Sequence, residues 1–186
     1  MIIKKNPDGQ IVVAVSGKKN SGKTTLIEAL LPLLTQAGVK VAVVKHHGHR
    51  FEGDIPDTPE TDTYRFFRNG AYATAIFDDE LFGSVVRKTV TESDLIAQFA
   101  DAGLILLEGF KHTDWPKILL VRDDPATYDA NAANVLAVVT NVDLEGRIPE
   151  NTPVFDPDDR KSIAAMILDK LAGERESGRK RGEIER

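Results

Sequence analysis

Short apolar runs alternate with longer amphipathic segments along nearly the whole chain. The runs are rich in β-branched residues and predict strands, whereas the segments between them repeat apolar residues at helical spacing. Strands that alternate with helices favour an α/β fold in which helices flank a sheet. The predicted strands span residues 11–15, 40–45, 72–77, 83–89, 104–107, 117–121, 135–139 and 154–155, and the predicted helices begin near residues 25, 61, 92 and 159.

Local signals mark where two of these helices begin and end. Gly38 is expected to cap the first helix. Pro32 lies inside that helix and removes one backbone donor, so we expect a kink or an early end there. Thr91 and Asp94 have the spacing of a capping box at the start of the third helix.

A glycine-rich loop between the first predicted strand and helix carries the most specific chemistry. Residues 17–24 read Gly-Lys-Lys-Asn-Ser-Gly-Lys-Thr, which fits the G-x-x-x-x-G-K-T pattern of phosphate-binding loops. In such a loop, backbone N–H groups and the helix N-terminus bind phosphate. We expect Lys23 to reach the β- and γ-phosphates and the Thr24 hydroxyl to ligate Mg²⁺, and we count Ser21 among the nucleotide-binding residues. The chain is therefore predicted to bind a nucleotide.

Two acidic residues are candidates for metal binding and catalysis. Glu108 follows the apolar run 104–107, and ligands of α/β sheets collect at the carboxyl ends of the strands. A carboxylate there holds the water shell of Mg²⁺ or polarises an attacking water. Asp62 opens the second predicted helix, where it is either an N-terminal helix charge or a further member of the magnesium shell. Glu108 and Asp62 are the predicted catalytic residues and, with Thr24, the predicted metal ligands.

The segment after the strand over 135–139 bears on the choice of base. Many guanine-binding proteins carry N/T-K-x-D at this place, and the aspartate accepts hydrogen bonds from guanine. Thr140 and Asp143 agree with the first and fourth positions, but Asn141 replaces the lysine. Asn/Asp turns after strands are also common. Thr140 and Asp143 are the predicted base contacts, and they favour guanine over adenine.

Residues 46–60 read as a long loop that begins with several histidines. His46, His47 and His49, with Asp54, have the residue types of a zinc site, but adjacent histidines often point apart. Histidines that contact phosphate, a partner or water are the favoured reading. Two interpretations of Lys45 and His46 stay open. They act beside an anionic ligand, or they have no functional role.

Composition excludes several classes of protein. The net charge of −5 predicts no nucleic-acid or membrane-surface partner. The absence of cysteine excludes disulfides and thiolate sites and is typical of a cytoplasmic protein. No apolar run approaches the length of a membrane span.

The length of 186 residues suits one α/β domain, expected over residues 1–172. Residues 173–186 are rich in charged residues, with five basic and four acidic side chains, and predict a flexible tail.

Several segments together resemble the molybdopterin-guanine dinucleotide biosynthesis adaptor family, MobB. The resemblance runs from about residue 11 to about residue 156. It rests on residues 17–26, Lys45-His46-His47-Gly48-His49, Asp62-Thr63-Tyr64-Arg65 with Asn69-Gly70-Ala71, and Leu107-Glu108-Gly109-Phe110-Lys111 with Pro116-Lys117-Ile118. Glu60 and Thr61 stand where the family has glycine and lysine, so Arg65 or Arg68 would have to replace any contact of that lysine.

The resemblance implies a P-loop NTPase fold with a mostly parallel mixed sheet, a homodimer, and GTP binding with Mg²⁺ and slow or absent hydrolysis. It implies support for attachment of GMP to molybdenum cofactor, alongside the guanylyltransferase MobA and the molybdenum insertase. By the same resemblance, Glu108 matches the acidic strand end and Asp62 the family aspartate. The loop residues that match the family are Gly17, Asn20, Gly22, Lys23, Thr24 and Thr25.

Two other classes of function are compatible with the same residues. An ATP-dependent small-molecule kinase or ligase of the dethiobiotin synthetase-like class would use the same phosphate loop, with an acceptor pocket near residues 46–54. A metal-binding or metal-delivery protein would use the histidines of that loop. ATP preference with turnover would indicate the first class, and stoichiometric zinc or nickel would indicate the second.

Overall fold

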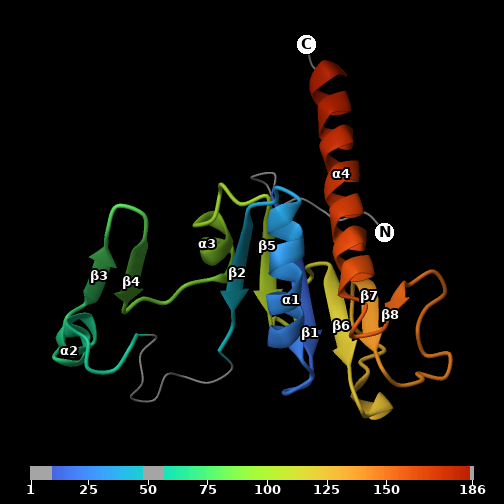
Figure 1. The fold of residues 1–186 in the computed structure, drawn as a ribbon, viewed down its shortest axis with the longest axis horizontal. Coiled ribbons are helices and arrows are strands. Elements are labelled where there is room, and N and C mark those ends of the chain that lie inside the picture. The colour runs from blue at the N-terminus through green and yellow to red at the C-terminus, as the bar shows by residue number, and fades with distance from the viewer. Residues whose placement is uncertain (1–9, 48–56, 185–186) are drawn as a thin grey trace. The chain divides into compact units, whose positions relative to one another are not determined.

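The computed structural model describes residues 10–47 and 57–184. The chain divides into two compact units, whose bounds differ from those two ranges. The main unit comprises Met1–His46 and Leu95–Arg186, and the hairpin unit comprises His47–Asp94. The elements are β1 Ile11–Gly17, α1 Lys23–Gln36, β2 Val41–Lys45, α2 Asp62–Arg68, β3 Ala73–Phe77, β4 Phe82–Val86, α3 Glu92–Ala97, β5 Leu104–Glu108, β6 Lys117–Val121, η1 Pro125–Thr127, β7 Val135–Thr140, β8 Val154–Phe155 and α4 Arg160–Ile184 (Figure 1).

Six parallel strands form the sheet of the main unit, in the order β2-β5-β1-β6-β7-β8. Their carboxyl ends therefore meet at one edge, where ligands of such sheets bind. β5 lies between β1 and β2, and Glu108 at its end is the register partner of both Val15 and Lys45. The predicted α/β fold with a mostly parallel sheet flanked by helices is confirmed.

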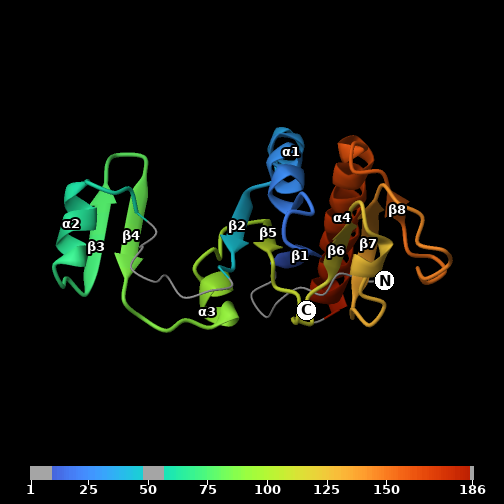
Figure 2. The same cartoon turned by 90° about the horizontal axis from the view of Figure 1, so that it is seen from below.

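The two faces of this sheet bury alternate residues of β1. Val13 and Val15 belong to the cluster that contains the apolar side chains of α1 and α4, whereas Val12 and Ala14 belong to the cluster that contains Ile96 of α3. All four β1 side chains are fully buried, as expected for a central parallel strand. Figure 2 shows α1 and α3 on opposite sides of the sheet.

The ends of α1 and α4 differ in how well the sequence predicts them. The C-cap of α1 is Ala37, and Gly38, the predicted cap, follows it with φ of 77° and donates its N–H to the Thr35 carbonyl at 2.9 Å. The helix passes Pro32 and ends after Gln36, so the expected early end does not occur.

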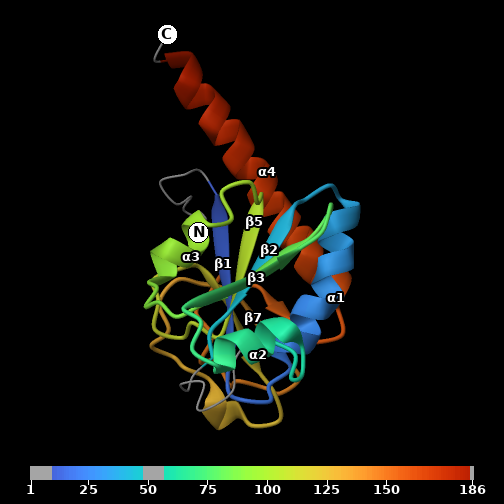
Figure 3. The same cartoon turned by 90° about the vertical axis from the view of Figure 1, so that its left-hand side faces the viewer.

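α4 continues to Ile184, beyond residue 172, and extends past the edge of the sheet (Figures 1 and 3). Residues 173–184 of the expected tail belong to this helix, in keeping with the high helix propensity of Glu, Lys and Arg, and the flexibility of the tail stays a prediction.

The hairpin unit contains α2 and the antiparallel pair β3–β4. Phe67 of α2 is buried, and the Arg87 guanidinium lies over its ring at 4.1 Å while donating to its carbonyl at 2.9 Å. Thr91 and Asp94 exchange hydrogen bonds as the predicted capping box requires. The structure thus divides the single domain expected over residues 1–172, because β3 and β4 pair with each other and not with the six-stranded sheet.

Candidate functional site

The loop from Gly17 to Gly22 joins the end of β1 to the start of α1. Asn20 and Gly22 adopt left-handed backbone conformations, with φ of 65° and 90°. Helix α1 has no side-chain cap and no acidic residue in its first turn. The N–H groups at a helix start need partners, and their partial positive charge favours an anion. This helix start is therefore suited to phosphate, as the sequence predicts.

Gly17 is fixed by close packing at the start of the loop. A Cβ atom on Gly17 would lie 2.6 Å from the Leu120 carbonyl oxygen and 2.6 Å from Ser21 Oγ. Ser21 is buried, and its hydroxyl has no hydrogen-bond partner among the described residues. A buried hydroxyl without a partner costs free energy, so the loop holds a polar group that a ligand can satisfy.

The tight packing at Gly17 leads to a first prediction. Gly17→Ala is expected to weaken nucleotide binding by about tenfold to 100-fold, because overpacking costs roughly 1–3 kcal/mol and the loop must shift. Isothermal titration calorimetry measures the change. Gly173→Ala is the control, since a Cβ there meets no atom within 4 Å among the described residues outside its own helix backbone. Unchanged affinity in Gly17→Ala would show that the loop conformation does not control binding.

Lys23 lies at the first position of α1 and folds back over the loop. Its Nζ atom donates to the Gly17 carbonyl at 3.2 Å and to the Lys18 carbonyl at 2.7 Å. Desolvation lowers the pKa of Lys23; nearby Glu108 opposes this effect, and Lys111 and Lys45 add to it. The ammonium group is thus held in the loop that is predicted to bind phosphate.

Thr24 and Glu108 meet at the carboxyl edge of the sheet. The Thr24 hydroxyl donates to Glu108 Oε1 at 2.9 Å, and Lys45 Nζ lies 3.1 Å from the same oxygen. Glu108 is buried, with 8% of its surface exposed. A hydroxyl and a carboxylate in contact are hard oxygen donors, which fit the Mg²⁺ that nucleotide sites of this type hold. Thr24 and Glu108 would hold the ion, which would neutralise phosphate charge when bound.

Gly109 continues the strand that carries Glu108. The apolar run 104–107 predicts a strand that ends before Glu108, but Glu108 is the last residue of β5. Gly109 has φ of 106°, which favours glycine, and its N–H donates to the Val15 carbonyl. Ser16 Oγ donates to the Gly109 carbonyl at 2.8 Å. These two contacts with β1 therefore fix the backbone that follows Glu108 beside the loop.

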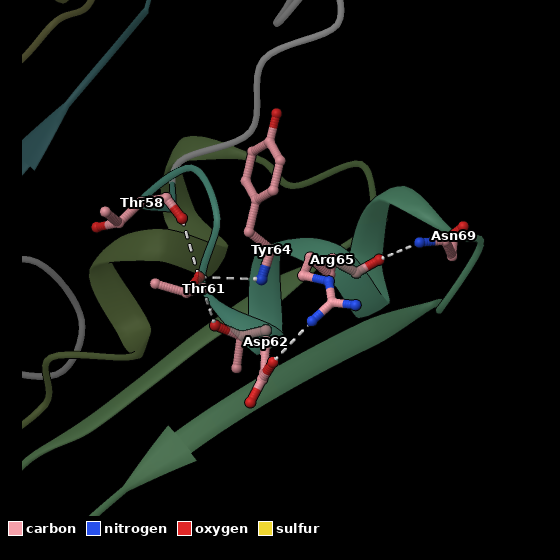
Figure 4. Close-up of polar contacts among 7 residues, drawn as sticks. Thr58, Thr61, Asp62, Tyr64, Arg65 and Asn69 are labelled. Carbon is pink, nitrogen blue, oxygen red and sulfur yellow. Dashed lines mark hydrogen bonds and ion pairs between the residues drawn. The ribbon is translucent and has the colours of Figure 1, made fainter.

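Asp62 belongs to the hairpin unit, whereas Thr24 and Glu108 belong to the main unit. Its carboxylate is 3.4 Å from Arg65 Nη1, and its side chain is 79% exposed (Figure 4). Thr61 caps α2, and its hydroxyl accepts a hydrogen bond from the Tyr64 N–H. These contacts are those of an acidic residue in the first turn of a helix. The role of Asp62 in metal binding and catalysis stays a prediction.

Thr140 and Asp143 form local turn contacts. The Thr140 hydroxyl donates to the Val142 carbonyl and accepts from its N–H, and Asp143 Oδ1 accepts from the Glu145 N–H at 2.8 Å. Asn141 Nδ2 donates to Asp123 Oδ1 at 3.0 Å. These side chains thus stabilise a turn after the strand, which is the alternative to a guanine contact that the sequence also allows. Their contact with guanine stays a prediction.

A pocket borders the loop on the side of Gly22 and Thr25. Arg122 at the end of β6 and Asp158 before α4 line it. Their contribution was missed from the sequence, because only the fold brings the end of β6 and the start of α4 beside the loop. The further lining residues are Ser21, Leu26, Leu120, Val121, Val139, Pro157 and Arg160.

The histidine segment lies only partly within the described residues. His46 stacks obliquely on Phe110, with ring centroids 5.5 Å apart. His49 and Asp54 lie outside the described residues, and among the described ones no three His, Cys, Asp or Glu side chains gather as a metal site. Within the same residues, no helix is long and apolar enough to cross a membrane.

Comparison with known proteins gives consistent results. The family model of molybdopterin guanine dinucleotide synthesis protein B, MobB, matches residues 12–141. The probable molybdopterin-guanine dinucleotide biosynthesis adapter protein of Bacillus subtilis strain 168 is 32% identical, with 88% of this chain and 94% of that protein covered. The Escherichia coli K12 adapter protein is 28% identical, with 85% and 91% covered.

Solved structures agree in fold. The crystal structure of a MobB homolog from Bacillus stearothermophilus has a TM-score of 0.68 at 30% identity, with 87% of this chain and 98% of that chain covered. The structure of Bacillus subtilis MobB has a TM-score of 0.69 at 28% identity, with 86% and 97% covered.

Proposed function

We propose that this chain, which belongs to the MobB family of molybdopterin guanine dinucleotide synthesis proteins, is a GTP-binding adapter of that biosynthesis. The observation that supports GTP binding most directly is the uncapped start of α1, with Lys23 inside the loop and Thr24 on Glu108. The backbone N–H groups and the ammonium group would bind the triphosphate. The Thr24 and Glu108 oxygens would bind the Mg²⁺ that accompanies it.

We propose that any hydrolysis of GTP by this site is slow. Glu108 Oε1 contacts both Thr24 and Lys45, so these two groups compete with an attacking water for that oxygen. Asp62 remains the second candidate for that role. The ATP-dependent kinase or ligase is not favoured, because the relatives are adapter proteins.

Nucleotide selectivity tests this proposal. Calorimetry with Mg²⁺ is expected to show GTP binding at least about tenfold more tightly than ATP, because unpaired polar groups penalise the wrong base. Asp143→Asn is expected to reduce this preference, because Asp143 is a predicted base contact, and Asp158→Asn tests whether the pocket beside the loop contributes as well. Equal binding of ATP and GTP would contradict the proposed guanine preference.

We also propose a homodimer in which the β3–β4 hairpin contributes the interface. Phe77 and Phe82 are cross-strand partners and are 79% and 73% exposed. Ile76 and Leu81 are likewise exposed. A two-stranded hairpin is only marginally stable alone, and apolar clusters of this kind mark interaction sites. The family's implied partners, the guanylyltransferase MobA and the molybdenum insertase, would act with this dimer in the cytoplasm.

A further inference from the structure

Lys45 reaches the candidate nucleotide site from the edge of the sheet. It ends β2, opposite Glu108 in the register of β2 and β5. Its Nζ atom lies 3.1 Å from Glu108 Oε1, the same oxygen that accepts from Thr24. The Lys45 side chain is 56% exposed, whereas that of Glu108 is 10% exposed. The sheet therefore brings an accessible cation to a buried carboxylate at the metal-binding edge.

The charge balance of this edge explains why such a cation is useful. A triphosphate placed on the loop brings several negative charges close to Glu108, and like charges at short range repel. The effect is larger near a buried group than in water. Lys45 offsets the charge of the Glu108 carboxylate, so the site presents less negative charge to an approaching triphosphate.

Lys45 and Lys23 act on different parts of the same edge. Lys23 Nζ is held by the carbonyls of Gly17 and Lys18 inside the loop, whereas Lys45 is held by Glu108 outside it. The two cations influence each other, because Lys45 contributes to lowering the pKa of Lys23. Lys45 thus contacts the buried Glu108 carboxylate directly, whereas Lys23 interacts with it electrostatically from within the loop.

We propose that Lys45 is a positioning residue that holds Glu108 and permits a nucleoside triphosphate to bind without a divalent cation. This inference rests on the proposed GTP binding. It predicts that metal-free binding depends on Lys45 much more than binding in the presence of Mg²⁺ does. Lys45 thus acts through Glu108, and the two residues should be energetically coupled.

The test compares GTP affinity in Mg²⁺ with affinity in EDTA for the purified full chain. Lys45→Met is expected to weaken binding about tenfold or more in EDTA and less than about threefold in Mg²⁺. Lys45→Arg is expected to retain the metal dependence of the unaltered chain, since it keeps the charge. Lys40→Met is the matched control, because Lys40 precedes the opposite end of β2 and pairs with exposed Asp101 at 3.5 Å.

A double-mutant cycle with Glu108→Gln shows whether Lys45 acts through the carboxylate. In the Glu108→Gln background, Lys45→Met is expected to have little effect in EDTA, because no negative charge remains to be neutralised. An equal loss of affinity from Lys45→Met with and without Glu108 would overturn the inference, as would an unchanged metal dependence in Lys45→Met. Failure of the unaltered chain to bind GTP at all would instead contradict the proposed function, and with it this inference.

Discussion

Lys23→Met is expected to weaken GTP binding by at least about 100-fold, because it removes the ammonium group that is predicted to contact the phosphates. In the structure this group donates to two carbonyls of its own loop, Gly17 and Lys18. A bound triphosphate would replace these neutral acceptors with charged ones, which form stronger hydrogen bonds. The methionine fills a similar volume, so the change tests the charge and not the packing. Calorimetry with GTP and Mg²⁺ measures the loss.

Lys19→Met is the control for this experiment. Lys19 lies in the same loop with an exposed side chain, and exposed charges are screened by salt. We expect its GTP affinity to change by less than about threefold. Normal affinity in Lys23→Met, in a variant whose circular dichroism is unchanged, would refute the assignment of the phosphate site.

Phe82→Asp is expected to convert the proposed homodimer to monomers, raising its dissociation constant at least about 100-fold. Phe82 faces its cross-strand partner Phe77 on the exposed hairpin, and a carboxylate buried there would have no partner. Sedimentation velocity across a concentration series measures the dimer. Because Phe82 is exposed in the single chain, the variant is expected to fold normally.

Val154→Asp is the matched control for the hairpin variant. Val154 is an exposed apolar strand residue, 52% accessible, in β8 of the main unit. We expect this variant to remain as dimeric as the unaltered chain. If Phe82→Asp also leaves the dimer unchanged, the hairpin is not the interface, and a chain that is monomeric without substitutions would contradict the homodimer itself.

The loop and its acidic neighbour are predicted from the sequence because their signals are local. Residues 17–24 lie between a buried strand and a helix, and the apolar run before Glu108 marks a strand end in one short segment. The order of strands is not local in this way. The pairing of β3 with β4, which creates the hairpin unit, depends on which sheet the strands join, and their composition alone does not decide it.

The contact of Lys45 with Glu108 likewise could not be predicted from the sequence. It requires that β5 lies between β1 and β2, and only the strand order provides this. For Thr140 and Asp143, a short motif fitted both a base contact and a turn, and the structure shows the turn hydrogen bonds. The helical extension of α4 over residues 173–184 does not follow from the charge pattern, which is compatible with both a solvated tail and a helix rich in Glu, Lys and Arg.

The position of β5 also has a consequence for how the chain folds. β1 pairs with β5 and not with β2, so the centre of the sheet joins segments that are far apart in the sequence. Pairings of this kind slow folding, because a long stretch of chain must be ordered before they form. During synthesis the phosphate loop emerges long before its acidic partner at residue 108. A chain released early would therefore carry the loop without the strand that completes it.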